Sequence, residues 1–525
     1  MALSFLQELL TSTLVLSVLI SLYIRSKRSN SPQLPIDWPI FGMLPAIVFN
    51  LGNFHEFLTF LLSTSRHNYK ARIASIRFFL TSDPVNVRHI LTSNHANYLK
   101  GAEFPEIFDV MRGTFFTTDG ESWRQQRAKI QSILSSPQIL SLTAKCCLHK
   151  IEQGLVPFLI RMARTSTPFD MNDVISRFAF DMTAMPIFSV DPGQLSSSHM
   201  PSVDVSIAMD TVMEVAFYRQ IVPASCWKLM RRIKVGPECK IVRAHMVLRG
   251  FIAEMVERRS KMEGQQKQEA DDDGHVDILS HYLNDPYYKD QDLLRAKLIT
   301  YMVAGRDTIS TTLPWVLYNL ARNPHVLSVI RNEMTPIASS KTSYSTTTCS
   351  QAGTIIIIFN PDETKALVYL HAALLETLRL YPPIPLERKT VASSDVLPSG
   401  HEVHEGEIIV ISLYAMARMK DIWGEDCLEF RPERWLSESE DGGGKLRYVP
   451  SNTFLAFNSG PRMCLGKDIA IMEMKTVMAT ILWNFDFEML QGPPAVEQKL
   501  SVLLQMKNGL MVKVKERDVS INNTD

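Results

Sequence analysis

The sequence predicts a mainly α-helical fold with a smaller β region. Helical periodicity, in which apolar side chains recur every three to four positions, is clearest over residues 54–65, 119–134, 292–319 and 369–380. Residues 71–78 are instead typical of a strand. Pro314 predicts a kink in the helix over residues 292–319. No linker divides the 525-residue chain, so we expect residues 46–525 to form one large catalytic domain.

Composition excludes several classes of function. Apolar residues make up 46% of the chain and charged residues 21%, which is typical of a globular protein. The formal net charge is zero, which argues against a nucleic acid as partner. The seven cysteines include no C-x-x-C pair, so the sequence predicts a reducing compartment without a disulfide framework or a zinc site.

Residues 1–30 are predicted to form a membrane anchor and its basic stop. Residues 9–24 are uncharged and mostly apolar, and with the preceding turn they approach the roughly 20 residues that span a bilayer. Arg25, Lys27 and Arg28 follow at once, which predicts a cytosolic catalytic domain and an N-terminus across the membrane. No small-residue cleavage site closes the apolar run. A cleaved signal peptide and an amphipathic surface helix are the alternatives.

Residues 31–45 are predicted to form a hinge between the anchor and the catalytic domain. This stretch contains four prolines, namely Pro32, Pro35, Pro39 and Pro45. Proline at such spacing prevents a helix and favours a stiff, extended chain.

The chemistry of the chain is expected to centre on residues 457–466. Cys464 lies in a loop between Gly460 and Gly466, which give the backbone the freedom to aim the sulfur at a metal. A cysteine thiolate donates electron density strongly to haem iron. Arg462 suits a haem propionate, because a guanidinium matches the geometry of a carboxylate. The alternative is a buried structural cysteine in a glycine turn.

The helix over residues 292–319 carries a second candidate site. Ala304 and Gly305 are small, so a ligand could approach the backbone there, and Asp307 and Thr308 follow. A carboxylate beside a hydroxyl could bind dioxygen and relay protons from solvent. The alternative is an ordinary mid-helix threonine that bonds back to the carbonyl four residues earlier.

Two further pairs have helical spacing. Trp123 and Arg127 share one face, and both present N–H donors that suit a carboxylate; a cation–π contact is the simpler interpretation. Glu376 and Arg379 are opposite charges in an apolar helix that ends before Pro382, and buried charges there would need partners. The alternative for this pair is an exposed i,i+3 ion pair worth about 0.2 to 0.5 kcal/mol.

These motifs resemble those of a known family. The pattern F-x-x-G-x-R-x-C-x-G, from Phe457 to Gly466, resembles the haem-binding signature of the cytochrome P-450 monooxygenases. Residues 304–308 are similar to the oxygen-activation motif A-G-x-D-T of that family. The resemblance implies haem b with Cys464 as its axial thiolate ligand, and the cytochrome P-450 fold with β structure also around residues 396–412. The haem is then expected between the helix of Thr308 and the loop of Cys464.

The resemblance also assigns roles to the other pairs. It implies that Trp123 and Arg127 hydrogen-bond a haem propionate. It implies that Arg434, from a later segment, completes a structural triad with Glu376 and Arg379.

The activity implied is the hydroxylation of a substrate with dioxygen, with protons delivered through Asp307 and Thr308. Two rival functions are an oxygen-independent haem-thiolate isomerase or dehydratase, and a non-catalytic haem sensor or carrier. The intact motif at residues 304–308 favours the monooxygenase, because a rearrangement needs no proton relay to dioxygen. A sensor is expected to carry a regulatory domain, and the sequence shows none.

The sequence between the motifs resembles that of the plant fatty-acid and alkane hydroxylase clan, especially its mid-chain alkane hydroxylase branch. This implies an apolar substrate, most simply a long-chain alkane or its alcohol in wax or lipid metabolism, with alkaloid phenol coupling as the alternative. The expected pocket walls are Phe104, Phe108, Phe115, Phe116, Val303, Ala304, Ile384, Leu386, Leu503 and Leu504. Arg112 and Arg306 are the basic candidates for gripping a fatty-acid carboxylate.

The partners follow from what the chain lacks. It contains no flavin or iron–sulfur motif, so a separate NADPH-dependent cytochrome P-450 reductase is expected to supply both electrons. Arg124, Lys129, Lys467 and Lys475 are the predicted docking cations, with an ordinary solvated surface as the alternative. The expected location is the endoplasmic reticulum membrane.

Overall fold

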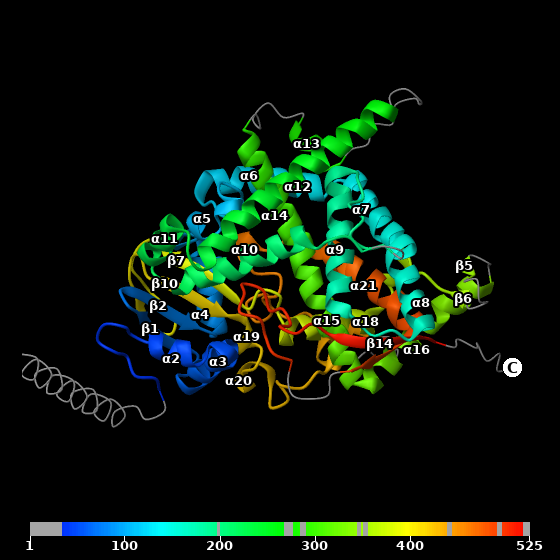
Figure 1. Ribbon diagram of the computed structural model, residues 1–525. Coiled ribbons are helices and arrows are strands. Elements are labelled where there is room, and N and C mark those ends of the chain that lie inside the picture. The colour runs from blue at the N-terminus through cyan, green and yellow to red at the C-terminus, as the bar shows by residue number, and fades with distance from the viewer. Residues whose placement is uncertain are drawn as a thin grey trace, which may run out of the picture.

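The computed structural model describes residues 34–196, 200–266, 277–283, 290–343, 348–349, 355–437, 444–490 and 496–517 (Figure 1). The predicted anchor over residues 1–30 lies outside these residues, as does Pro32. Among the described residues, no helix combines the length and the apolar character needed to cross a membrane. The described chain is mainly helical with a smaller β region, as predicted.

The helices follow in chain order. The first half contains α2 (Leu44–Phe49), α3 (Phe54–Thr64), α4 (Pro84–Arg88), α5 (Phe104–Ile107), α6 (Gly120–Leu134), α7 (Pro137–Lys150), α8 (Val156–Thr165), α9 (Met171–Phe188), α10 (Asp204–Ile221), α11 (Ala224–Ile233) and α12 (Pro237–Gln266). The second half contains α13 (Ser280–Leu283), α14 (Gln291–Met302), α15 (Thr308–Arg322), α16 (Pro324–Ser343), α17 (Pro361–Thr364), α18 (Val368–Leu380), α19 (Leu413–Met416), α20 (Lys420–Trp423) and α21 (Lys467–Asn484).

Shorter helical turns lie between these helices. Those of 3-10 type are η1 (Leu51–Asn53), η3 (His95–Asn97), η4 (Asp109–Met111), η8 (Pro432–Trp435) and η9 (Gly460–Arg462). Wider, π-type turns are η2 (His89–Ser93), η5 (Ile151–Leu155) and η7 (Val303–Asp307).

The largest sheet has the strand order β1-β2-β10-β7-β3 and lies to one side of the helices (Figure 1). Its strands are β1 (Asn68–Ile73), β2 (Ile76–Thr81), β10 (Ile408–Ser412), β7 (Leu386–Val391) and β3 (Tyr98–Leu99). β10 pairs with β2 in parallel, and the other pairs are antiparallel. Smaller sheets join β13 (Phe485–Met489), β14 (Met511–Glu516) and β4 (Phe169–Asp170), and pair β5 (Thr348–Cys349) with β6 (Ile355–Ile356), β8 (Asp395–Val396) with β9 (Glu402–Val403), and β11 (Leu436–Ser437) with β12 (Lys445–Leu446).

One local prediction was wrong, and a second was confirmed in part. The single strand expected over residues 71–78 is a hairpin, because the chain turns at Ala74, which has a left-handed φ of 50°, and β1 pairs back with β2. No glycine or proline marks this turn in the sequence. The helix expected over residues 292–319 is present as α14, η7 and α15, which follow one another without a gap, and the kink at Pro314, inside α15, stays a prediction.

The described part of the proline-rich segment contacts the sheet. Trp38 and Gly42 bond to each other through their backbones, and the guanidinium of Arg72 in β1 binds Asp37 and the carbonyl of Trp38. Pro45 lies in the first turn of α2, where a missing N–H costs nothing. The hinge role of residues 31–45 stays a prediction.

Four helices position the candidate site. α15 packs against α9, α18 and α21, and η7 packs against α9 as well. Buried aliphatic and aromatic side chains from these helices form one continuous core, which includes Leu313, Phe178, Leu374 and Val477. The loop that precedes α21 is therefore held at a constant place relative to the helix of Thr308.

Candidate active site

The loop that carries Cys464 is closed by its own backbone. The amide of Cys464 donates to the carbonyl of Phe457 at 2.8 Å, and the amide of Met463 donates to the carbonyl of Gly460 at 3.0 Å. The short helix η9 lies inside the loop, and α21 begins three residues after Cys464. These bonds fix the direction of the cysteine side chain, which is exposed to an internal cavity.

The two glycines of the loop serve different purposes. Gly460 has a φ of 63°, and a Cβ there would lie 2.1 Å from the carbonyl oxygen of Leu91, so the fold itself requires glycine. Gly466 has an ordinary φ of −91°, and a Cβ there would meet no protein atom within 4 Å. The prediction that Gly466 supplies backbone freedom is therefore wrong. It lines the cavity, so its missing side chain leaves space for a ligand.

The electrostatic surroundings of Cys464 combine opposing effects. Burial raises the pKa of its thiol, whereas the N–H of Gly466 and the charges of Arg127 and Lys467 lower it. The sulfur is thus removed from bulk water while facing donors and cations that favour the thiolate. A metal ion at this place would add the positive charge that completes the deprotonation.

Trp123, Arg127 and Arg462 meet beside this loop and line the same cavity. The guanidinium of Arg462 lies over the ring of Trp123, 4.3 Å from its centroid, and Arg127 donates to the carbonyl of Met463 at 2.6 Å. Arg462 is also paired with Asp119 at 2.7 Å. Two cations therefore converge beside the ring of Trp123 at one edge of the cavity, where they suit a carboxylate.

The cavity has a volume of about 380 Å³ and extends from the loop of Cys464 to the helix of Thr308. On that helix, its wall includes Val303, Ala304 and Thr308. The hydroxyl of Thr308 donates to the carbonyl of Ala304 at 2.8 Å, the back-bond that mid-helix threonines commonly form. Gly305 lines the cavity too, but a Cβ on it would lie 2.6 Å from the side chain of Thr183, so it also allows η7 to pack closely on α9.

Asp307 points away from the cavity, unlike its neighbour Thr308. It is fully buried, and one carboxylate oxygen accepts from Arg306 at 2.7 Å while the other has no partner among the described residues. Burial raises the pKa of Asp307 to about 6, against the lowering effect of Arg306. Arg306 also binds Asp210 of α10 at 2.7 Å and Ser176 of α9 at 2.6 Å. Any proton relay through Asp307 would therefore require this carboxylate to turn.

Glu376 and Arg379 form a buried pair, not an exposed one. Their side chains are 0% and 1% exposed, and two hydrogen bonds of 2.8 Å join them. Arg434 approaches the same carboxylate at 3.3 Å, as the resemblance implies, and Trp435 donates to it at 2.9 Å. Arg379 further donates to the carbonyl of Cys427. The cluster ties α18 to the segment that follows α20.

A comparison of the sequence with known protein families agrees with the geometry of this site. Residues 32–514 match the family described as Cytochrome P450. The chain belongs to the cytochrome P450 family.

Relatives of this cytochrome P450 match it over nearly the full length. Noroxomaritidine synthase 2 of Narcissus pseudonarcissus is 37% identical, over 96% of this chain and 95% of its own. An alkane hydroxylase of Arabidopsis thaliana is 35% identical over 94% and 96%, and cytochrome P450 86B1 of the same plant is 33% identical over 97% and 90%. The chain is therefore a P450 oxidoreductase, and the predicted resemblance to the plant fatty-acid and alkane hydroxylase clan is confirmed.

Membership of the P450 family implies haem with a cysteine thiolate, dioxygen, and electrons from a reductase. The described residues fit a haem: the sulfur of Cys464 faces the cavity, the space beside Gly466 is empty of protein, and Arg127 and Arg462 lie at one edge where propionates could be bound. We find no group of histidine, cysteine and acidic side chains, among the described residues, that would hold a different metal ion.

Most of the predicted pocket walls of this P450 line the cavity, and three do not. Those that do are Phe108, Phe115, Phe116, Val303, Ala304, Ile384 and Leu503. Phe104 is buried behind Phe108 and Phe116, with ring centroids 4.8 and 5.4 Å away. Leu504 is fully buried, its carbonyl accepting from Trp315, and Leu386 faces a second cavity. Leu386 begins β7, where alternation puts Leu386 and Arg388 toward the second cavity and Glu387, between them, toward the main one.

Neither of the two arginines predicted to bind a substrate carboxylate faces the cavity of this P450. Arg112 is exposed and does not line it, and Arg306 is buried between two carboxylates. Three charged residues that the sequence did not suggest do line it: Lys100 and Glu387, paired at 3.0 Å, and Glu473 of α21. Burial lowers the pKa of Lys100 to about 8; burial would raise the pKa of Glu387, but Lys100 and Lys389 hold it at about 2. Because Lys100 and Glu387 are 287 positions apart, no spacing in the sequence could have indicated that they pair.

The four predicted docking cations separate into two groups. Lys475 is buried, and its ammonium donates to the carbonyl of Lys365, so it cannot present charge to a partner. Its position on the inner face of α21 explains the wrong prediction. Arg124 and Lys467 are exposed, and Lys129 lies over the ring of Tyr282.

Proposed function

We propose that this P450 is a membrane-bound monooxygenase that hydroxylates a long-chain alkane or an alkane-derived alcohol. The observation that carries this proposal is the apolar lining of the cavity away from Cys464. Aromatic and aliphatic side chains come from the segment of α5 and η4, from α10 and from residues 502–503, namely Phe108, Met111, Phe115, Phe116, Met213, Val502 and Leu503. Such a wall suits a substrate without charge.

The charged groups in the cavity support the same choice. Lys100 and Glu387 neutralise each other, and Arg462 is paired with Asp119. A substrate carboxylate would have to compete with these pairs or remain buried without a partner, which costs free energy. Alkanes and alcohols therefore rank above free fatty acids. The similarity to an alkane hydroxylase agrees with this order.

A second candidate is a specialised-metabolite oxidation such as alkaloid phenol coupling. The similarity to relatives named noroxomaritidine synthase favours it. An amine substrate would need an anionic partner. Of the two acidic residues that line the cavity, Glu387 is already engaged by two lysines, and burial raises the pKa of Glu473 to about 8, which favours its neutral form at pH 7.

When bound, a haem with a thiolate ligand supplies the activation of dioxygen and the transfer of one oxygen atom to carbon. The residues of this chain hold and orient the reactants. Cys464 would provide the thiolate, and Trp123, Arg127 and Arg462 would hold the propionates. Thr308 places a hydroxyl in the cavity, where it can hold a proton at Oγ1. The apolar wall excludes water from the carbon to be oxidised.

We also propose that residues 1–30 anchor the enzyme in the endoplasmic reticulum membrane and that residues 31–45 connect this anchor to the cytosolic catalytic domain. The apolar run and the basic residues that follow it support this arrangement. Electrons would come from a separate NADPH-dependent reductase that binds near Arg124 and Lys467.

Spectral titration of the haem-loaded enzyme tests the substrate class. A long-chain alkane, the matching primary alcohol, the matching fatty acid and a phenolic amine are added in parallel, and displacement of water from the iron is followed. NADPH-dependent product formation with the reductase is then measured for each ligand that binds. We expect binding and hydroxylation with the alkane or the alcohol. Binding and turnover of the phenolic amine alone would contradict the proposal.

A further inference from the structure

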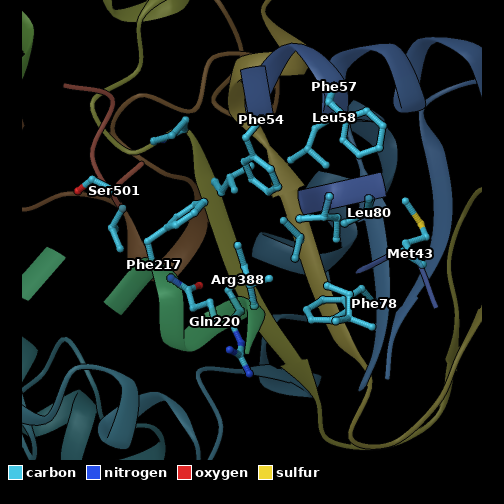
Figure 2. A pocket seen from close by; sticks show the side chains of 18 residues that line it. Met43, Phe54, Phe57, Leu58, Phe78, Leu80, Phe217, Gln220, Arg388 and Ser501 are labelled. Atoms are coloured by element: carbon cyan, nitrogen blue, oxygen red, sulfur yellow. The ribbon is translucent and has the colours of Figure 1, made fainter. Parts of the chain in front are cut away.

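A second cavity, which we call the sheet cavity, lies between the large sheet and the helices α2, α3 and α10. Its volume is about 90 Å³. Figure 2 shows aromatic and aliphatic side chains converging on it, among them Phe54, Phe78, Leu80 and Phe217. The rings of Phe54 and Phe217 meet edge to face, with centroids 5.4 Å apart, at its α10 side. Nothing in the proposed reaction uses this space directly.

The chemistry of the sheet cavity fits an uncharged chain. Its polar lining residues are Gln220, Arg388 and Ser501 (Figure 2). The guanidinium of Arg388 is paired with Glu103 at 2.8 Å, and its buried Nε has no hydrogen-bond partner among the described residues. The remainder of the lining is aliphatic or aromatic. A methylene chain would be favoured here and a charged group would not.

The sheet cavity adjoins the main cavity. Residues 383–388 separate the two: Ile384 and Glu387 line the main cavity, while Leu386 and Arg388 line the sheet cavity. Val502 lines both. It is half-buried, whereas its neighbours Ser501 and Leu503 are buried. The partition at this point is therefore a single layer of side chains.

We propose that the sheet cavity is a subsite for the unreactive end of a long aliphatic substrate. The carbon to be oxidised lies in the main cavity, and the chain passes Val502 and ends between Phe54 and Phe217. This inference rests on the proposed function, since it specifies the chain length of the aliphatic substrate. With this subsite, the affinity for an aliphatic ligand should keep rising for chains that are longer than the main cavity can hold. Each methylene group that becomes buried strengthens binding about fourfold.

A series of 1-alkylimidazoles tests this inference on the full-length, haem-loaded enzyme. The imidazole nitrogen binds iron and changes the absorption spectrum, so dissociation constants are measured without turnover. Two variants alter the sheet cavity in opposite directions. Ala71→Leu fills it from β1, and Phe217→Ala enlarges it from α10; both residues line the sheet cavity and neither lines the main one.

In the unmodified enzyme we expect affinity to rise with chain length and then level off. The levelling should occur at shorter chains in Ala71→Leu and at longer chains in Phe217→Ala, while methylimidazole binds all three enzymes equally. General damage to the fold would shift both variants in the same direction and weaken methylimidazole binding. If Ala71→Leu does not fold, Leu386→Phe fills the same space and should give the same shortening.

The inference would be overturned if Ala71→Leu and Phe217→Ala both fold and show the same dependence of affinity on alkyl chain length. This outcome is distinguishable from failure of the proposed function, because the alkylimidazoles report the cavity whether or not alkanes are oxidised. If the enzyme oxidises only a phenolic amine and yet the variants shift the length profile in opposite directions, the subsite stands and the substrate class falls.

Discussion

Replacing Glu376 by alanine should destabilise the protein far more than its local sequence suggests. Its carboxylate accepts five hydrogen bonds: two from Arg379 at 2.8 Å, and one each from Arg434 at 3.3 Å, Trp435 at 2.9 Å and the amide of Arg431 at 3.0 Å. The variant removes the carboxylate that pairs with the buried guanidinium of Arg379, whereas Arg434 keeps Asp426 at 3.1 Å. Breaking a buried ion pair in this way costs about 3 to 5 kcal/mol of the free energy of unfolding.

The chain offers a matched control with the same i,i+3 spacing. Glu121 pairs with Arg124 at 3.3 Å, but these side chains are 66% and 64% exposed. Glu121 also lies in the first turn of α6, where a negative charge interacts favourably with the helix dipole. Glu121→Ala should therefore cost less than about 1 kcal/mol. Glu376→Gln, which keeps one acceptor oxygen but loses the charge, should fall between the two.

Urea denaturation of the haem-loaded variants measures these differences. Tryptophan fluorescence and haem absorbance are followed together, and equal transitions by both probes justify a single free energy of unfolding. If Glu376→Ala and Glu121→Ala differ by less than about 1 kcal/mol, the buried cluster does not stabilise the fold as argued here.

Three other predictions concern single side chains. Thr308→Ala should retain haem and substrate binding but divert electrons from NADPH to hydrogen peroxide, whereas Thr308→Ser should keep product formation; tight coupling in the alanine variant would remove the role of the hydroxyl. Burial raises the pKa of Glu473, on α21, to about 8, so this carboxyl should contribute a fall in the free energy of unfolding of roughly 1.4 kcal/mol per pH unit between pH 4.5 and 8, because in that range it ionises only in the unfolded state. Glu473→Gln should lose this slope and be more stable than the wild type at pH 8 but not at pH 4.5; an unchanged slope in urea titrations would exclude Glu473 as its source. Lys467→Glu should weaken reductase binding and reduce its salt dependence, while Lys261→Glu on α12 should not; equal effects would place docking elsewhere.

The parts of the site that could be predicted from the sequence are those made by residues close together in the chain. The loop from Phe457 to Cys464 and the pair Glu376 and Arg379 are closed by bonds spanning three to seven positions, so their spacing carries the information. Helix boundaries such as those of α3 and α18 follow from periodicity in the same way. The family resemblance added Arg434, which no local pattern would have supplied.

What the sequence could not show depends on distant residues or on side-chain direction. Lys100 meets Glu387 across 287 positions, and Arg306 meets Asp210 across 96. The wide turn η7 directs Asp307 and Thr308 to different surroundings, although they are adjacent in the motif. The sequence suggests that Lys475 is a surface cation, but the packing of α21 buries it.

The central claim is that Cys464 is the axial ligand of a haem, and one spectrum tests it. The reduced carbon monoxide complex of the purified enzyme should show the red-shifted Soret band of a thiolate-bound haem. Cys226→Ala, at an exposed cysteine, should retain that band, and Cys464→Ala should lose it while keeping its helical circular dichroism. A folded Cys464→Ala protein that retained the band would contradict the assignment.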